Sequence, residues 1–238
     1  MTIAQRQDEV IAAAADPTRS GSSFFITILE TEQDPICRWH ALKAIGDLRA
    51  SDAKDTLLRV LQEQDVEFDE SSLHRICARA IGRIGSSAAL QVAQLLHEAS
   101  SVQTRIAAID ALGEIADRGS VSVLADQLTS DDRGIRLWAA LSLAKIGEAS
   151  IPAIDKALEN ADEESVFILV DALAIIGTAK TIPSLVNAFN KHPKGVLSYF
   201  RSGPSGRAAR YAEAVIGFGS EIPIALLDEI RHSLADRR

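Results

Sequence analysis

The segment KAIGDL at Lys43–Leu48 is the first of six similar segments that decide the fold of this 238-residue chain. The other copies are RAIGRI (79–84), DALGEI (110–115), SLAKIG (142–147), ALAIIG (172–177) and AVIGFG (214–219). Their anchor residues, separated by steps of 36, 31, 31, 30 and 42 residues, are Gly46, Gly82, Gly113, Ala144, Ala174 and Ile216. A repeat of this length holds two helices that cannot bury their apolar faces alone, so neighbouring repeats must stack. The spacing predicts an all-α fold, a right-handed α-solenoid (superhelix) of about six helical hairpins.

Each repeat is predicted to contain a helix A, a short turn and a helix B. In the fourth repeat, helix A is expected at Val121–Leu128, and helix B begins near Ile135 with small and aliphatic residues at three-and-four spacing. We expect the B helices to line the concave side. No run alternates polar and apolar residues between hairpin turns, so no strand is expected.

The first 23 residues differ from the repeats. Ile3–Ala15 predicts one amphipathic helix, and DPTRSGSS at 16–23 predicts a turn-rich linker. We interpret residues 1–23 as an N-terminal capping helix with its linker, and residues 24–238 as the solenoid.

Composition excludes some classes of partner. The net charge of −8 opposes general affinity for nucleic acid or an anionic membrane, because both require a basic surface. The polar N-terminus lacks the apolar core of a signal peptide, and Cys37 and Cys77 sit in helical motifs as expected core residues. The longest apolar run, 166–177, is interrupted by Asp171 and is too short to span a membrane. These features predict a cytoplasmic protein without a membrane or nucleic-acid partner.

A polar ladder is predicted at the start of the B helices. Eight residues before the anchors stand Arg38, His74, Arg105, Arg136, Val166 and Ala208. Four residues before those stand Asp34, Glu70, Ser101, Asp132, Asp162 and Pro204. Acidic or hydroxyl residues there can cap the B helix, and the basic residues can bridge neighbouring repeats. This structural role competes with ligand binding for the same side chains.

The acidic turn, the Val/Ile-Arg pair, the small residues at helical spacing and the A-L/I-G-x-I segment together resemble HEAT repeats. The alanine-rich version with proline-started helices is similar to that of the phycobilisome-lyase type, which occurs in cyanobacterial E/F-type bilin lyases and a related phycobilisome degradation factor. The resemblance covers about residues 24–230. It implies a protein that attaches, detaches or isomerises a bilin, such as phycocyanobilin or a related open-chain tetrapyrrole. The implied partner is a phycobiliprotein subunit that supplies the cysteine, with a second HEAT-repeat subunit as a further candidate partner.

The same resemblance implies roles for particular residues. Bases would hold the bilin propionates, and an acidic residue would stabilise a protonated bilin. Candidates for the bases are Arg38, Arg75, Arg105 and Arg136, and candidates for the acid are Asp110 and Asp171. The alternative, which fits the repeats equally well, is a non-catalytic adaptor whose concave groove binds a protein partner.

A basic segment is the first candidate site outside the ladder. Residues 172–212 contain six basic and no acidic residues. We interpret about 190–210 as a loop insertion that could bind an anionic, flat, conjugated ligand by forked hydrogen bonds and stacking. Its candidate residues are Tyr199, Arg201, Arg207, Arg210 and Tyr211. A plain connector is the alternative.

The second candidate site is the adjacent pair Trp39 and His40 in the first B helix. Repeats with so few aromatic residues have little need of such a pair for packing, so we expect it on the concave surface. His74 and Arg75 would follow along the same groove. No phosphate-binding loop or metal-binding spacing is present: a single His-Glu pair occurs at 97–98, and the cysteines are far apart.

Overall fold

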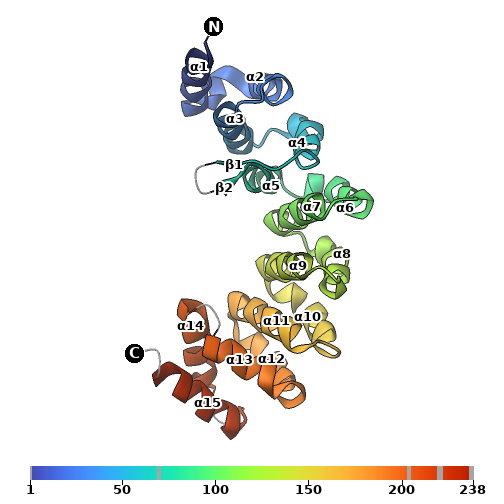
Figure 1. Ribbon diagram of the computed structural model, residues 1–238, viewed down its shortest axis with the longest axis vertical. Helices are drawn as coiled ribbons and strands as arrows, with labels where there is room; N and C mark the ends of the chain where they lie inside the picture. Colours follow the sequence, from blue (N-terminus) through green and yellow to red (C-terminus); the bar gives the residue numbers. More distant parts are fainter. Residues whose placement is uncertain (1, 69–70, 203–204, 219–221, 236–238) are drawn as a thin grey trace. The chain divides into compact units, whose positions relative to one another are not determined.

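The computed structural model describes residues 2–68, 71–202, 205–218 and 222–235, which are predominantly helical (Figure 1). The chain divides into two compact units, unit 1 at Met1–Ser120 and unit 2 at Val121–Arg238. Each unit is a series of helical hairpins, so the predicted all-α repeat fold is confirmed.

In unit 1, the B helices pack side by side and the A helices pack against them on one side. The B helices are α1 (Ile3–Ala15), α3 (Pro35–Leu48), α5 (Leu73–Ile84) and α7 (Val102–Ile115). The A helices are α2 (Pro17–Thr31), α4 (Lys54–Val60) and α6 (Ala89–Glu98). The predicted N-terminal helix is therefore present, and it packs against α3.

Unit 2 repeats this arrangement and then departs from it. Its B helices are α9 (Arg133–Ile146), α11 (Glu163–Ile176) and α13 (Pro193–Ser202). Its A helices are α8 (Val121–Asp126), α10 (Ile151–Leu158) and α12 (Ile182–Lys191), followed by α14 (Ser205–Gly217) and α15 (Ile224–Ala235). Short 3-10 turns connect the helices: η1 (Ser51–Ala53), η2 (Ser86–Ala88), η3 (Arg118–Ser120), η4 (Gln127–Thr129), η5 (Gly147–Ser150) and η6 (Ala179–Thr181).

Side-chain caps explain where the B helices begin. The side chains that accept a hydrogen bond from the backbone N–H three residues ahead are Asp34, Ser72, Ser101, Asp132 and Asp162. Such caps satisfy donors that have no partner within the helix. Four of the predicted caps are confirmed. Glu70 and Pro204 lie outside the described residues, and Ser72 caps α5.

The ends of the B helices are equally regular. Each of the helices α3, α5, α7, α9 and α11 is followed by a residue with positive φ. These residues are Arg49, Gly85, Ala116, Gly147 and Gly177. This conformation ends the helix and turns the chain toward the next A helix. Arg49 and Ala116 pay a steric cost there that glycine would avoid.

The anchor glycines of unit 1 allow the B helices to approach closely. A Cβ atom on Gly82 would lie 2.7 Å from Cβ of Glu114 and 2.8 Å from its backbone carbonyl. One on Gly46 would lie 3.1 Å from Cα of Ala80. The glycine of the repeated segment is therefore a packing requirement where α5 meets α7.

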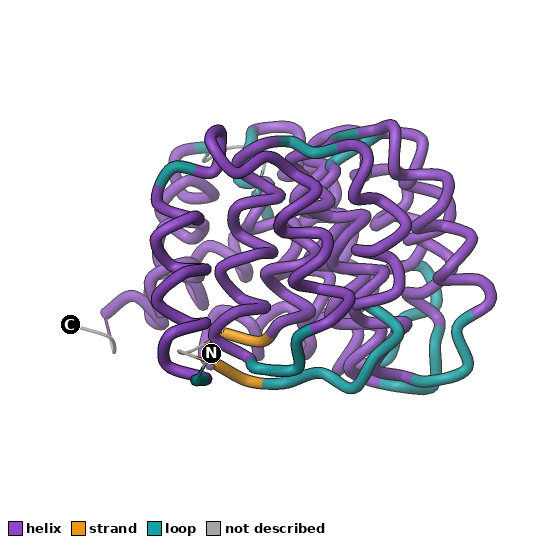
Figure 2. The backbone as a smooth tube through the Cα atoms, turned by 90° about the horizontal axis from the view of Figure 1, so that it is seen from above, coloured by secondary structure: helices purple, strands orange, loops and turns teal. Residues whose placement is uncertain are grey.

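Two predictions about the first half of the chain are wrong in detail. The expected linker at 16–23 is mostly helical, because α2 begins at Pro17 and only Gly21, with φ 72°, leaves the helix. A short antiparallel pair, β1 (Glu67–Phe68) and β2 (Ser71–Ser72), was not expected (Figure 2). Two residues per strand are too few to show the alternation by which strands are recognised.

The expected loop insertion at about 190–210 is also wrong, because most of it is helix. α13 takes the B position beside α11 and packs on α12, with Gly195 so close that a Cβ would lie 2.8 Å from Cγ1 of Val166. The sixth anchor, Ile216, lies on α14, which is no B helix. Instead, α14 packs on α11 and α13 from the side opposite to α10 and α12 (Figure 1).

One helical run, Arg133–Leu158, is long and apolar enough to cross a membrane by length and composition alone. The run consists of α9, η5 and α10, and Gly147 with φ 86° ends α9 within it. Its apolar residues include the buried Ile135, Leu143 and Ile154, which belong to the core of unit 2.

Candidate binding surface on the B helices

Arg38 is a structural residue of the polar ladder. Its side chain is buried, with Nη1 donating to the carbonyl oxygens of Leu29 (3.0 Å) and Glu32 (3.2 Å). Nη2 donates to the carboxylate of Glu63. The guanidinium thus satisfies the last carbonyls of α2 and links them to the segment after α4.

His74 and Arg136 also bind backbone carbonyl oxygens that precede their own B helices. His74 is buried, and its Nε2 lies 3.1 Å from the carbonyl oxygens of Val60 and Glu63, so this nitrogen carries the donated proton. Arg136 donates to the carbonyls of Ser130 (2.9 Å) and Asp131 (3.1 Å) and to Glu164 Oε2 (2.6 Å).

The ladder interpretation therefore explains these three residues. Burial keeps Arg38 and His74 away from a surface ligand, and their predicted binding role is wrong for that reason. Arg105 occupies the same repeat position on α7 and is half-buried.

A different set of positions on the B helices of unit 1 lies on one helix face, and most of its side chains are exposed or half-buried. They lie seven and three residues before each anchor and one residue after it, a spacing of four that places them on one helix face. We call this set the B-face: Trp39, Lys43 and Asp47 on α3, Arg75, Arg79 and Arg83 on α5, and Ile106, Asp110 and Glu114 on α7. Asp110 is buried within it, with 3% exposure.

The most distinctive part of the B-face is the arginine stripe of α5, formed by Arg75, Arg79 and Arg83. Arg83 pairs with Asp47, whose other oxygen lies 3.5 Å from Nζ of Lys43. Arg79 is exposed and forms no hydrogen bond or ion pair with the described residues. Three guanidinium groups at four-residue spacing form a rigidly mounted cationic row that suits carboxylate or phosphate groups.

Of these three arginines, only Arg75 is among the residues predicted from the sequence. Arg79 and Arg83 belong to RAIGRI, a segment whose repetition indicates packing. The signal that could have identified them is the spacing of the three arginines, which places them on the face opposite to the buried Ile81 and Cys77.

Trp39 and His40 lie beside this stripe on α3. Both are half-buried, and their rings meet edge to face with centroids 4.9 Å apart. Burial, and secondarily the nearby Lys43 charge, lowers the pKa of His40. Trp39 occupies the same repeat position as Arg75, so the pair adds a flat apolar surface next to the cations.

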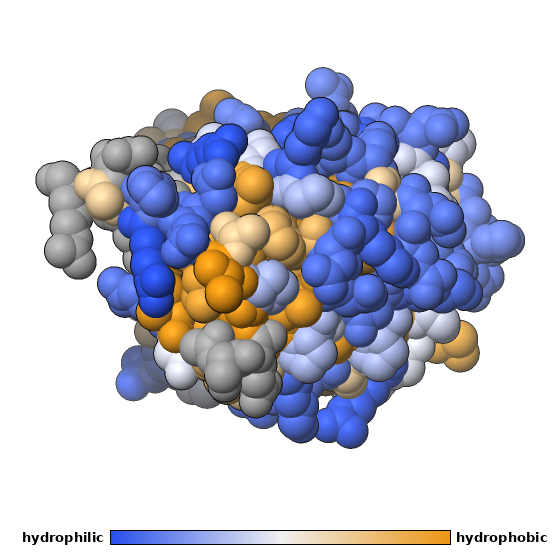
Figure 3. Space-filling model, turned by 90° about the horizontal axis from the view of Figure 1, so that it is seen from below, coloured by the Kyte–Doolittle hydropathy of each residue, from blue (hydrophilic) through white to orange (hydrophobic). Residues whose placement is uncertain are grey.

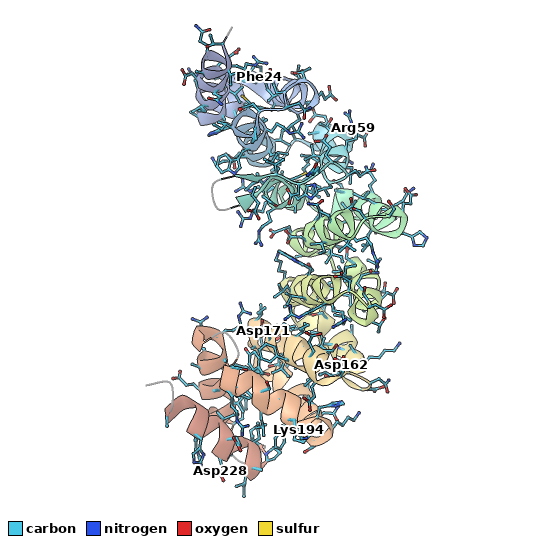
Figure 4. The ribbon with its side chains drawn as sticks, in the orientation of Figure 1. Phe24, Arg59, Asp162, Asp171, Lys194 and Asp228 are labelled. Carbon is cyan, nitrogen blue, oxygen red and sulfur yellow. The ribbon has the colours of Figure 1, made fainter. Side chains whose placement is uncertain are left out.

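In unit 2, the corresponding face is covered. Asp171, three residues before its anchor, accepts hydrogen bonds from the Tyr199 hydroxyl (3.1 Å) and from Nη1 of Arg207. Figure 4 shows Asp171 on α11 where that helix faces α14. Asp171 is 7% exposed and already paired with a cation, so the role of stabilising a protonated bilin does not fit it.

Tyr199 and Tyr211 belong to the core of unit 2. Tyr211 donates to Oγ1 of Thr181 (3.1 Å), and its ring stacks on that of Phe200 with 6.2 Å between centroids. Burial raises the pKa of both tyrosines. The prediction that these rings contact a surface ligand is wrong, because both are almost fully buried.

The remaining residues of the basic segment have different partners and lie in different surroundings. Arg201 pairs with Glu229 of α15 at 2.6 Å, Arg207 pairs with Asp171, and Arg210 is exposed on α14. The structure therefore does not gather the five predicted residues of this segment into one site.

The cysteines are core residues, as predicted. Burial raises the pKa of Cys37 to about 11 and also raises that of Cys77, whose thiol donates to the Leu57 carbonyl at 3.3 Å. Among the described residues, no three His, Cys, Asp or Glu side chains are grouped so that they could hold a metal ion.

An apolar patch covers part of the end of the molecule that α15 forms (Figure 3). Exposed apolar side chains of this part of the chain include Ile224 (76% exposed) and Phe218 (37%). Exposed apolar residues are common at the ends of repeat stacks, where no further repeat covers them.

Comparison with known proteins supports the repeat assignment. Residues 91–167, from within α6 to the start of α11, match the family model for HEAT repeats. The hairpins on either side repeat the same caps and turns, so the fold is that of a helical-hairpin repeat protein. The search of curated proteins gave no match.

Several solved structures have a similar fold. An archaeal HEAT-like repeats protein from Thermococcus onnurineus is 16% identical, with 98% of each chain covered and a TM-score of 0.46. A designed armadillo repeat protein in complex with the peptide (KR)4 is 18% identical over 80% of this chain and 98% of that one, with a TM-score of 0.46. The complex of CpcE and CpcF of phycocyanin lyase from Nostoc is 15% identical over 91% of this chain and 94% of that one, with a TM-score of 0.34. With identities and TM-scores this low, none of the three carries an argument about function.

Proposed function

We propose that this protein is a cytoplasmic HEAT-type adaptor that binds a protein partner on the B-face of unit 1. The observation that carries the proposal is the arginine stripe, above all Arg79, which is exposed and without a partner among the described residues. A cation that no described residue pairs with is available to a partner. Helical repeats suit this task because their side chains are held on rigid elements.

The electrostatics favour an oriented interaction. The chain carries a net charge of −8, so a local row of arginines creates a field opposite in sign to the rest of the surface. Such complementarity steers encounter and selects partners more than it adds affinity. The half-buried Trp39 supplies apolar contact area beside the charges.

Site-specific photo-crosslinking tests this proposal. A photoreactive residue at position 79 in the full chain is compared with one at Leu90, which is 81% exposed on the A helix α6. In a native extract, discrete crosslinked protein bands are expected from position 79 and not from position 90. Equal yields from both positions, or none from position 79, would contradict a binding role for the B-face.

A second candidate is the handling of an open-chain tetrapyrrole on a phycobiliprotein subunit, with a second HEAT-repeat subunit as a further partner. One observation favours it: Trp39 and His40 offer a flat surface, and Arg75 stands at the matching position. Arg75 would hold a propionate. Asp110 is as buried as Arg38, with 3% exposure, so the role of stabilising a protonated bilin does not fit it. Any catalysis would act on a cysteine of the partner.

Absorbance spectroscopy with phycocyanobilin separates the two candidates. Bilin handling predicts a red shift and a higher extinction on mixing, both lost in Trp39→Ala and kept in Trp138→Ala, the chain's other tryptophan. An unchanged spectrum would contradict bilin handling and leave the adaptor function standing.

A further inference from the structure

Helix α14 is an example of a helix that packs against the B helices of this fold. Its buried residues are Ala208, Tyr211, Ala212 and Val215, which form one stripe along the helix. The helix therefore packs on α11 and α13 with an apolar face. Its N-terminal turn contributes one charged contact, from Arg207 to Asp171.

The charged contact falls at a defined repeat position. Asp171 stands three residues before the anchor Ala174, and the equivalent positions in unit 1 are Lys43 on α3, Arg79 on α5 and the buried Asp110 on α7. A basic side chain on the docked helix meets an acidic one on the B helix in unit 2. On α3 and α5 the side chain at this position is basic and exposed, so a helix complementary to these two helices would be acidic.

In the described part of unit 1, no helix of the unit covers this face as α14 covers α11. The described elements that pack on α5 are α3, α4, α7, η2 and β2, and Arg79 remains exposed among them. Lys43 is also exposed, with half of its side chain accessible although it lies near Asp47. Among the described residues, Arg79 is therefore an unpaired positive charge in unit 1, whereas unit 2 has the Arg207–Asp171 ion pair.

We propose that the B-face of unit 1 binds an acidic amphipathic α-helix of a partner protein, laid against α3 and α5 as α14 is laid against α11. This deepens the proposed function and rests on it. A carboxylate of the bound helix would reach Arg79, and a second one, four residues away, would reach Arg75 or Arg83. An apolar residue between them would cover the half-buried Trp39 of α3.

The strength of the contact depends on how far water is excluded. A charge-assisted hydrogen bond contributes more when it is desolvated than when it is exposed. Because Arg79 is central in the row, a bound helix would cover it more than Arg83, which already pairs with Asp47. Loss of the Arg79 guanidinium is therefore expected to weaken binding about tenfold, whereas an arginine elsewhere should have no effect.

Calorimetric titration of the full chain with designed peptides tests this. A peptide of about 15 residues is long enough to cross two neighbouring B helices. The probe carries glutamates four residues apart beside a leucine stripe. One comparison peptide has lysine for each glutamate, and another keeps the composition but has a central proline that breaks the helix.

The acidic helix is expected to bind with an affinity that falls as salt is raised, while the lysine peptide does not bind and the proline peptide binds at least tenfold more weakly. Arg79→Ala should weaken the acidic helix about tenfold. The matched control Arg118→Ala, an exposed arginine in η3 of the same unit, should change nothing. Circular dichroism melting of both variants checks that the fold is retained.

Three results would overturn the inference. The first is equal binding of the helical and proline-containing peptides, and the second is an equal effect of the two arginine variants. The third is binding of double-stranded DNA or polyphosphate with the same dependence on Arg79, which would make the stripe a general anion site. If position 79 crosslinks to a protein but no acidic helix binds, the adaptor function stands and this inference fails.

Discussion

Unit 1 and unit 2 are built from the same hairpin, yet the equivalent positions on their B helices carry different residues. In unit 1 the row three residues before the anchors reads Lys43, Arg79 and Asp110, and its first two members are exposed. In unit 2 the row reads Leu141 and Asp171, and Asp171 lies beneath α13 and α14. One face is open and basic, and the other is closed by the chain itself.

This difference between the units shows that packing between hairpins and binding at the surface depend on different positions of the repeat. Anchors and caps hold the hairpins together, and they are small or polar in both units. Exposed B-face positions such as Lys43 and Arg79 are not needed for that packing, so their chemistry is free to serve binding in unit 1, as that of Asp171 serves to hold α14 in unit 2. The following predictions test this division between packing and surface.

The largest effect is expected at the packing anchor of unit 1. Gly82→Ala should lower the free energy of unfolding by about 3 kcal/mol, because the new methyl group would press against the backbone of Glu114. Denaturant unfolding followed by the fluorescence of Trp39 measures it. The control Gly206→Ala, where nothing lies within 4 Å, should cost nothing. Equal losses in both variants would mean that the close approach of α5 and α7 is not what requires glycine.

The second effect concerns the contact that holds α14. Arg207→Ala should destabilise unit 2 by about 2 kcal/mol, because the nearly buried Asp171 loses its cation. Arg201→Ala and Arg210→Ala should each stay within about 0.5 kcal/mol, since both side chains are exposed. Unfolding monitored at Trp138 measures these differences. A loss for Arg210→Ala as large as that for Arg207→Ala would show that the ion pair does not hold the helix.

A smaller and opposite effect is expected at a helix end of unit 1. Ala116→Gly should stabilise the protein by about 1 kcal/mol, because Ala116 has φ 54° and glycine adopts this conformation without strain. Gly147→Ala in unit 2 should destabilise it, since φ is 86° there. Thermal melting of both variants checks the signs, and a stabilised Gly147→Ala would contradict the role given to these turns.

The free energy of unfolding should depend on pH differently in the two units, and it should not change with pH near neutrality. Burial raises the pKa of Tyr211, so the stability gained from its protonated form is complete below about pH 10 and is lost at higher pH. The lowered pKa of His40 acts at the other end, where stability falls as the pH drops below about 6.5. Unfolding curves across pH should show a weaker alkaline loss in Tyr211→Phe and a weaker acid loss in His40→Gln. Unchanged slopes in both would contradict the assigned environments.

Much of the fold could be predicted from the sequence, because packing repeats with a period. The first five anchors, the caps such as Asp132 and the proline-started helices such as α12 are local signals, and they lie where they were expected. The period fails at the sixth anchor, Ile216, because α14 is not a B helix and packs instead on α11 and α13. There Tyr199 and Tyr211 were interpreted as surface rings because they lie among glycine, serine and arginine, but long-range packing buries them.

The candidate site was less predictable. Arg38 and Arg79 are both arginines of B helices, and only their distance from the anchor separates a buried ladder residue from a surface one. Sequence analysis chose the position eight residues before the anchor, which faces the ends of the A helices. Arg79 stands three residues before its anchor, Gly82. The structure distinguishes it from Arg38 because the guanidinium of Arg38 is bound to backbone carbonyls.

Charge reversal at Arg79 tests the central claim most directly, namely that the B-face of unit 1 is a binding surface for an acidic helix. Arg79→Glu is titrated with the glutamate peptide and with its lysine counterpart, beside Arg118→Glu, which changes the net charge equally. The account predicts that Arg79→Glu loses the acidic peptide and gains measurable affinity for the lysine peptide, while Arg118→Glu alters neither. If the two variants respond alike, or if Arg79→Glu binds the acidic peptide as tightly as the unaltered protein, the arginine stripe is not the binding surface.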